Sequence, residues 1–342
     1  DHAIMNIVTS AFGNAGQKCS ACSLLLVERS VYEDKNFQDK LKDAATSIKV
    51  GSVWEAGNVV GPMITNRNDK LLQALTLEPG ESWLVPPKFI DEKQYILAPT
   101  VKWGVKPGSY SFRTELFGPM LSVACIDNLQ QGIELVNSLD YGLTSGLQSL
   151  DENEQKLWKD SILAGNLYIN RGITGAIVNR QPFGGMKLSA FGGGVKAGGP
   201  NYCACLVKIT DKPESNTDYK QSYPHAYEEE FAHARDINKL YGEQNAFRYL
   251  PLKNMVLRLF PGDSNEEAEM IALATKLCHT PLTISFDPND DRTTALSSTG
   301  CTLKKETLDE FLKTMRSYER IRTCGADIPM EMYEEAARRN KY

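Results

Sequence analysis

The sequence predicts an α/β fold with open, largely parallel sheets, arranged in two units. Short apolar runs of strand length alternate with amphipathic stretches of helical spacing along most of the 342 residues. Capping residues and glycines bound several of these stretches, as they do at helix ends. A second alternating series starts near Phe247. Alternation of this kind is typical of βαβ units, in which helices cover a parallel sheet.

The first unit is expected to occupy residues 1–210. Apolar periodicity predicts helices over four ranges: 3–12, 36–51, 127–142 and 152–165. Short apolar runs predict strands over three ranges: 21–28, 121–126 and 166–170. We expect Gly51 to end the second helix and Asp127 to cap the third.

The segment from Gly165 to Gly199 contains ten glycines. Such density predicts a long, shaped loop with several residues at positive φ rather than regular structure. The run NYCACLVKIT that follows is expected to form one more strand, at about 200–210. The first unit is therefore predicted to close with a loop and a terminal strand.

The second unit is expected to occupy residues 247–342, after a polar connector over 211–246. Its predicted strands and helices alternate: strands at 254–260, 281–287 and 321–325, and helices at 264–280, 305–320 and 329–342. Ser264 and Glu267 have the spacing of a capping box. The pattern indicates part of a doubly wound, Rossmann-like sheet, and we expect this domain to be incomplete. It contains no G-x-G-x-x-G, so a working dinucleotide site there is not supported.

Composition and charge exclude several classes of protein. The formal net charge is −5 and the basic residues are spread along the chain, which argues against nucleic-acid binding. No apolar run approaches the ~20 residues that cross a bilayer, and no signal peptide opens the chain. Eight cysteines in a chain of this length indicate reduced thiols. We expect a soluble, cytoplasmic protein and, because both ends fall inside predicted helices, a fragment of a larger one.

The stretch FGNAGQKCSACS, residues 12–23, offers the most chemistry. Cys19 follows a glycine-containing turn whose backbone amides can face a thiolate and an oxyanion, as a nucleophile requires. Cys19 and Cys22 could instead form a redox pair or, with Cys203 and Cys205, a zinc site, although C-x-C spacing fits zinc poorly. Either thiol could also be a small buried side chain.

Three separated segments resemble the signature segments of the aldehyde dehydrogenase superfamily: FGNAGQKCSA, ELFGPMLSV and QPFGG. Their order and spacing are similar to those of the catalytic half of that fold. The loop YINRGITGAIVNRQPFGG, with KAGGPNY after it, resembles the Δ1-pyrroline-5-carboxylate (glutamate semialdehyde) dehydrogenase branch, which includes the second module of bifunctional proline-utilization A proteins. The sequence departs from relatives at four positions of the loop: Met186, Lys187, Leu188 and Ala190.

The resemblance implies a nucleophile and a cofactor, NAD. Cys19 would attack the aldehyde carbon and form a thiohemiacetal and then a thioester. Glu115 would accept hydrogen bonds from the hydroxyls of the nicotinamide ribose, a role that suits a group with acceptors only. Phe117 would pack beside the nicotinamide. No metal is implied.

The resemblance also implies how a substrate with an α-carboxylate is held. Four residues are implied to bind it: Ser20, Gly175, Ala176 and Phe183. Successive backbone N–H groups of the TGA turn can form an anion-binding nest, and the phenyl ring would cover the aliphatic chain. Arg171 and Arg180 are alternative ligands for the same anion.

The activity expected from the resemblance is NAD-dependent oxidation of L-glutamate γ-semialdehyde to glutamate in proline catabolism. The family's nucleotide-binding half, its glutamate base and its oxyanion asparagine precede the cysteine, so we expect this chain alone to be inactive. By the same resemblance, residues 200–210 would pair with a neighbouring subunit in a homo-oligomer rather than within the chain. Two alternatives stay open: a dehydrogenase for another acidic semialdehyde, and a non-catalytic assembly or metal-binding module.

Overall fold

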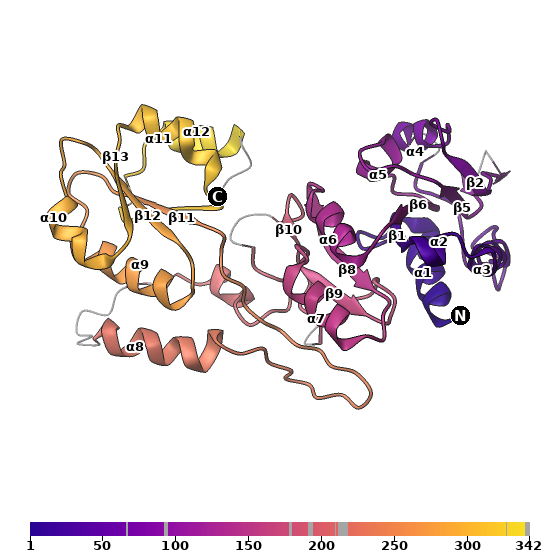
Figure 1. Cartoon of the computed structure of the whole chain (residues 1–342), viewed down its shortest axis with the longest axis horizontal. Coiled ribbons are helices and arrows are strands. Elements are labelled where there is room, and N and C mark those ends of the chain that lie inside the picture. The colour runs from indigo at the N-terminus through magenta and orange to yellow at the C-terminus, as the bar shows by residue number, and fades with distance from the viewer. Residues whose placement is uncertain are drawn as a thin grey trace. The chain divides into compact units, whose positions relative to one another are not determined.

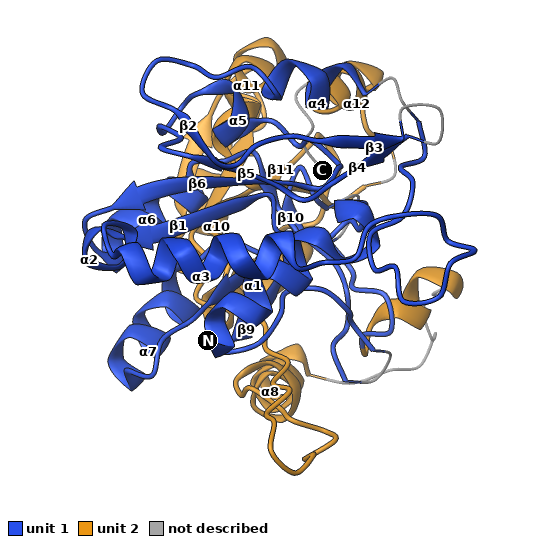
Figure 2. Cartoon of the chain, turned by 90° about the vertical axis from the view of Figure 1, so that its right-hand side faces the viewer, with its two compact units in different colours: residues 1–199 blue, residues 200–342 orange. Residues whose placement is uncertain are grey.

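The computed structural model divides into two compact units, residues 1–199 and 200–342 (Figure 2). It describes residues 1–65, 68–91, 95–177, 180–190, 194–208, 210, 218–325 and 327–338. The division lies before the terminal segment that the sequence assigns to the first unit. No helix in these ranges is long and apolar enough to cross a membrane.

The first unit is built on a four-stranded sheet of order β1-β6-β5-β2 (Figure 1). Its strands are β1 (Leu24–Glu28), β6 (Met120–Ile126), β5 (Thr100–Trp103) and β2 (Ser82–Val85). β6 runs parallel to both β1 and β5, whereas β2 pairs antiparallel with β5. Almost every residue of β5 and β6 is buried, as expected for central strands covered on both faces. The predicted open, largely parallel sheet is confirmed.

Four longer helices cover this unit and agree with the predicted helical ranges: α1 (His2–Phe12), α3 (Lys35–Thr46), α6 (Leu129–Asn137) and α7 (Glu152–Ser161). α1 packs against α3 and buries its apolar face in the core. α6 and α7 pack on each other beside a second, parallel pair of strands, β8 (Thr144–Leu147) and β9 (Asn166–Ile169).

The helix ends predicted at Gly51 and Asp127 are wrong. α3 ends at Thr46, before Gly51, because Val50 forms a parallel bridge with Val60 and the backbone is already extended there. The N-cap of α6 is Asn128, whose side chain accepts from the backbone N–H of Gln131. Asp127 is occupied elsewhere, since its carboxylate accepts hydrogen bonds from Arg29.

Several short elements were not predicted. They include the strands β2, β5 and β8 given above. The others are α2 (Arg29–Tyr32), α4 (Asp69–Ala74), α5 (Tyr110–Arg113), β3 (Phe89–Asp91), β4 (Ile96–Leu97), β7 (Tyr141–Gly142) and β10 (Met186–Lys187). β10 pairs with β7 and is the one strand in the described part of the loop between Gly172 and Gly199. Gly175, Gly194 and Gly198 have φ of +84°, +73° and +72°, so the expectation of positive-φ glycines in this loop is confirmed.

Within this single chain, residues 202–206 do not form the predicted terminal strand, and pairing of residues 200–210 with a neighbouring subunit stays a prediction. Tyr202–Leu206 is instead an exposed 3-10 helix, η2, and residues 209 and 211–217 lie outside the described ranges. A lone edge strand has no ladder to satisfy its backbone groups, whereas a 3-10 turn satisfies them locally. The predicted connector is partly helical, with α8 (Tyr219–Ala226) followed by a π-helix, η3 (Tyr227–Phe231).

The second unit contains a four-stranded, all-parallel sheet of order β13-β12-β11-β14. Its strands are β11 (Met255–Arg258), β12 (Leu282–Phe286), β13 (Thr302–Lys305) and β14 (Arg320–Thr323). This is the order of the first four strands of a Rossmann fold, 3-2-1-4, so the predicted Rossmann-like class is confirmed. Its helices are α9 (Asn265–Leu277), α10 (Thr293–Leu296), α11 (Leu308–Thr314) and α12 (Met330–Arg338).

The helix caps of the second unit follow the predicted chemistry in part. Ser264 caps α9 by accepting from the backbone N–H of Glu267 at 3.4 Å. The reciprocal capping box forms at α11 instead, where Thr307 and Glu310 each bond to the other's backbone N–H.

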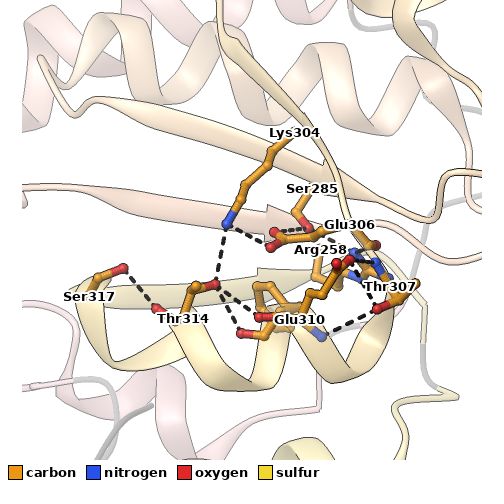
Figure 3. A network of polar contacts seen from close by, with 9 residues as sticks. Arg258, Ser285, Lys304, Glu306, Thr307, Glu310, Thr314 and Ser317 are labelled. Carbon is orange, nitrogen blue, oxygen red and sulfur yellow. Dashed lines mark hydrogen bonds and ion pairs between the residues drawn. The ribbon is translucent and has the colours of Figure 1, made fainter.

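A buried polar network joins three strands of this sheet near their carboxyl ends, on the face covered by α11 (Figure 3). Arg258, 2% exposed, donates to the Ser285 hydroxyl at 2.8 Å and to the Glu306 carbonyl at 2.9 Å. The Glu306 carboxylate accepts from Ser285 at 2.7 Å and pairs with Lys304 at 2.6 Å. Burial lowers the pKa of Arg258, and the nearby carboxylates of Glu306 and Asp287 oppose that shift. The guanidinium is therefore held by groups of its own sheet.

Candidate active site

Cys19 lies on a tight turn that follows α1. Asn14, Ala15 and Gly16 are all left-handed, with φ of 58°, 55° and 65°, and they reverse the chain after the helix. A second turn is closed by the N–H of Ala21, which donates to the carbonyl of Lys18 at 3.0 Å. The exposed Cys19 and the buried Ser20 occupy its two central positions. The thiol is thus presented on the surface by backbone that is fixed on both sides.

Cys22 has a different environment from Cys19. Its Sγ donates to the carbonyl of Leu24 at 3.5 Å, and burial raises its pKa to about 12. A thiol that stays protonated at neutral pH is a poor metal ligand and a poor redox nucleophile. In the described ranges no cluster of three or more His, Cys, Asp and Glu side chains has metal-binding geometry. The environment of Cys22 favours the small buried side chain over the redox pair.

The second signature segment, ELFGP, packs directly against the cysteine turn. A Cβ on Gly16 would meet the carbonyl oxygen of Gly118 at 2.2 Å, so only glycine allows this approach. The side chain of Gln17 donates to the carbonyl of Phe117 at 3.1 Å. Phe117 has φ of +49°, a strained conformation for a bulky residue. Glu115 is exposed, and its carboxylate bonds to none of the described residues.

The glycine-rich loop is tied to the same turn at Ile173, through Ser10 of α1. The Ser10 hydroxyl accepts from the N–H of Ile173 at 3.0 Å, and the Ser10 carbonyl accepts from the N–H of Cys22 at 3.0 Å. One buried residue therefore holds both the cysteine turn and the start of the TGA turn. Gly175 is exposed at positive φ, and Ala176 is half-buried. Ser10 could not be predicted as part of the site, because a serine in an amphipathic helix carries no signal of such a role.

Tyr168 connects Cys19 electrostatically to β9. Burial raises the pKa of Tyr168, the charge of Arg171 lowers it, and the negative charge of Cys19 raises it. The guanidinium of Arg171 lies 5.6 Å from the centre of the Tyr168 ring. The thiol and one alternative carboxylate ligand, Arg171, therefore both act on the same tyrosine at the end of β9.

Phe183 is held by backbone on two sides. It exchanges two backbone hydrogen bonds with Ala197, at 3.0 and 2.9 Å. Asn166 at the start of β9 donates to the carbonyl of Pro182 at 3.0 Å and accepts from the N–H of Gly184 at 3.2 Å. The half-buried phenyl ring thus belongs to a loop that is anchored to β9.

We expect Ser10→Ala to lower kcat/KM of the full-length protein about 10-fold, because small displacements of reacting groups are costly. The change removes the acceptor for Ile173 but keeps the Ser10 carbonyl that holds Cys22. Ser138→Ala is the matched control, since that exposed hydroxyl bonds only to the carbonyl of Leu135 in its own helix. Steady-state kinetics check the prediction, and equal values for both variants would contradict it.

The fold and the site together define an α/β domain with an exposed cysteine on a turn. The segment of Phe117 and the segment of Ile173, both distant in the sequence, are hydrogen-bonded to residues next to that turn. Such a domain has the parts of a thiol-dependent catalytic site. Residues 1–210 match the family model described as "Aldehyde dehydrogenase family", and the chain belongs to that family.

The similar curated proteins include 1-pyrroline-5-carboxylate dehydrogenases. The protein of Geobacillus kaustophilus is 35% identical over 202 residues, which are 58% of this chain and 38% of that protein. The protein of Bacillus licheniformis is 36% identical over 204 residues, 59% of this chain and 39% of that protein. The chain thus spans about two fifths of the length of these relatives.

Solved structures extend the similarity to the second unit. Proline utilization A from Corynebacterium freiburgense is 37% identical, with a TM-score of 0.80, and the match covers 100% of this chain and 34% of that one. A Thermus 1-pyrroline-5-carboxylate dehydrogenase with bound NAD is 33% identical, with a TM-score of 0.54, and the match covers 59% of this chain and 39% of that one.

Proposed function

We propose that the protein containing this chain oxidises L-glutamate γ-semialdehyde to glutamate with NAD as acceptor, and that Cys19 is its nucleophile. The observation that carries the proposal is that two segments distant in the sequence are hydrogen-bonded to residues of the cysteine turn and of the helix before it. Gln17 ties that turn to the segment proposed to hold the cofactor, and Ser10 ties it to the segment proposed to hold the substrate carboxylate. The curated relatives named for this substrate support the same assignment.

The residues proposed to hold NAD fit its chemistry. Glu115 offers an exposed carboxylate that bonds to none of the described residues and can accept from a ribose diol. Phe117 is held at a strained φ by the contact of its carbonyl with Gln17, which fixes the backbone beside the cysteine turn. When bound, NAD accepts the hydride released from the substrate carbon.

Cys19 supplies the covalent chemistry in this proposal. Its thiolate sulfur bonds to the aldehyde carbon, and the carbonyl oxygen takes up the electron pair as an oxyanion that backbone N–H groups can stabilise. After the thiohemiacetal has lost its hydride, a thioester links Cys19 to the acyl group. Attack by water then breaks the carbon–sulfur bond and releases the carboxylate product. The left-handed turn of Asn14, Ala15 and Gly16 holds the sulfur in one place through these steps.

The other end of the substrate carries the α-carboxylate. Ser20 lies next to the nucleophile, and Gly175 and Ala176 present backbone N–H groups on a turn at positive φ. We propose that these three residues bind the carboxylate and that Phe183 covers the methylene groups between it and the aldehyde. A substrate without that carboxylate should lose these contacts.

The test uses the full-length protein with NAD and two aldehydes. We expect kcat/KM for glutamate semialdehyde to exceed that for succinate semialdehyde at least about 10-fold. The reason is that only glutamate semialdehyde fits both Cys19 and the residues proposed to bind its α-carboxylate. A preference for succinate semialdehyde would favour another acidic semialdehyde as the substrate. Stoichiometric zinc that is lost on substitution of Cys19 or Cys22 would favour a metal-binding module instead.

We also propose that the 342-residue chain by itself forms no NADH. The relatives extend well beyond the matched part, and the family resemblance places the general base and the nucleotide-binding half there. NADH production by the purified chain, followed at 340 nm with glutamate semialdehyde, would overturn this second proposal alone.

A further inference from the structure

Lys196 is a half-buried cation without a carboxylate partner among the described residues. Its Nζ donates to the Gly165 carbonyl at 2.5 Å, the Gly184 carbonyl at 2.7 Å and Asn166 Oδ1 at 3.1 Å. Within the described ranges, no carboxylate lies within ion-pair distance of this Nζ. Burial is the one cause that lowers its pKa, to about 8. Withdrawal of this ammonium from water is compensated by hydrogen bonds to the three oxygens rather than by a counter-charge.

All three acceptors of Lys196 lie where the loop of Phe183 meets β9. The contact is very close: a Cβ on Gly165 would come within 1.8 Å of the carbonyl oxygen of Gly184. The ammonium of Lys196 joins Gly165 to Gly184 by donating to both carbonyls. The next residue, Ala197, exchanges the two backbone hydrogen bonds with Phe183. Lys196 therefore holds Gly184, the residue directly after Phe183, against Gly165 and Asn166 at the start of β9.

We propose that Lys196 is a positioning residue that clamps the Phe183 loop onto β9 and so fixes the ring against the aliphatic part of the substrate. The part about the substrate rests on the proposed function, whereas the clamp itself stands on the contacts of Nζ. Three donors of an ammonium match three oxygens. A neutral amine has only two donors, so the clamp loosens when Lys196 loses its proton.

The other titratable groups on the packed segments do not replace Lys196. Tyr168 on β9 couples with Arg171 and Cys19. Lys187 points its Nζ at the end of α6, where it donates to the carbonyls of Val136, Asn137 and Leu139 at 3.3, 3.3 and 2.7 Å. Arg180 lies three residues before Phe183, and its backbone N–H donates to the carbonyl of Ile177.

The kinetic test compares Lys196→Met with Lys187→Met in the full-length protein. Both variants remove an ammonium that donates to three oxygens, but Lys196 bonds to Gly184 beside Phe183 and to the start of β9, whereas Lys187 ties β10 to the end of α6. We expect Lys196→Met to raise KM for glutamate semialdehyde about 10-fold with kcat changed less than about 3-fold. Lys187→Met should leave KM within about 2-fold of the wild-type value. Equal effects of the two variants on KM would overturn the proposal.

A second measurement separates the clamp from the choice of substrate. The ¹⁹F resonance of 4-fluorophenylalanine placed at position 183 should move with pH, with a midpoint of about 8, in the otherwise wild-type protein. It should not titrate in Lys196→Met. A resonance that titrates alike in both proteins, or in neither, would refute the clamp. If the wild-type protein fails to oxidise glutamate semialdehyde while the resonance behaves as expected, the proposed function fails and the clamp stands.

Discussion

Cys19→Ser in the full-length protein should reduce NADH formation from glutamate semialdehyde about 10,000-fold or more. A serine hydroxyl stays protonated at neutral pH and cannot replace a thiolate as nucleophile, and groups that form covalent intermediates show losses of this size. Cys19 is exposed on its turn, so this change should leave the fold intact. Initial rates at saturating aldehyde and NAD, together with a circular dichroism spectrum, provide the measurement.

Cys22→Ala is the matched control for this experiment. Cys22 lies three residues further along the same segment, but its Sγ bonds to the carbonyl of Leu24 and its pKa is raised to about 12. We expect this variant to retain kcat within about 3-fold, with a stability loss of about 1 kcal/mol from the single hydrogen bond. If Cys19→Ser kept more than a tenth of the activity, or if Cys22→Ala lost as much, Cys19 would not be the nucleophile.

Lys102→Met should lower the free energy of unfolding of the first unit by about 3–5 kcal/mol, because it leaves the buried carboxylate of Glu81 without its charged partner. Lys102 and Glu81 pair at 3.0 Å with side chains only 1% exposed. Lys102 also donates to the carbonyl of Thr76 at 2.8 Å and to the hydroxyl of Ser111 at 3.0 Å. The pair links β5 to the residue just before β2, so its loss acts on the central sheet.

The double variant Lys102→Met/Glu81→Leu tests the cause of that loss. Removal of both charges leaves no unpaired buried carboxylate, so most of the free energy of unfolding should be recovered. Lys35→Met, which breaks an exposed pair with Asp39, should cost no more than about 0.5 kcal/mol. Urea unfolding followed by tryptophan fluorescence reports on the first unit alone, since all four tryptophans lie within residues 1–199. A double variant as unstable as Lys102→Met would contradict this explanation.

Much of the local structure was predictable from the sequence. Apolar periodicity located α1, α6, α7, α9 and the central strands β6 and β11, because each depends mainly on residues close in the chain. The exact ends were less predictable. Gly51 does not end α3, since a bridge between Val50 and Val60 extends the backbone first. The run at 202–206 has the composition of a strand but forms a 3-10 helix, because a strand also needs a partner.

The candidate site divides in the same way. The sequence by itself determined which segments we propose to carry the chemistry: the turn of Cys19, the segment of Glu115 and Phe117, and the glycine-rich loop with Phe183. The conformation of the turn before Cys19 was not predictable in the same way. Asn14 and Ala15 adopt left-handed φ beside Gly16, although neither of them is a glycine.

Only the tertiary structure decided how these segments meet. Gln17 reaches Phe117 across 100 residues, and Ser10 reaches Ile173 across 163. The half-buried position of Lys196 also arises only when the loop folds back onto β9. Periodicity and propensity describe neighbours along the chain, whereas these contacts depend on which helix and strand faces pack together. Donors and acceptors that close packing removes from water must then find partners, however far apart they lie in the sequence.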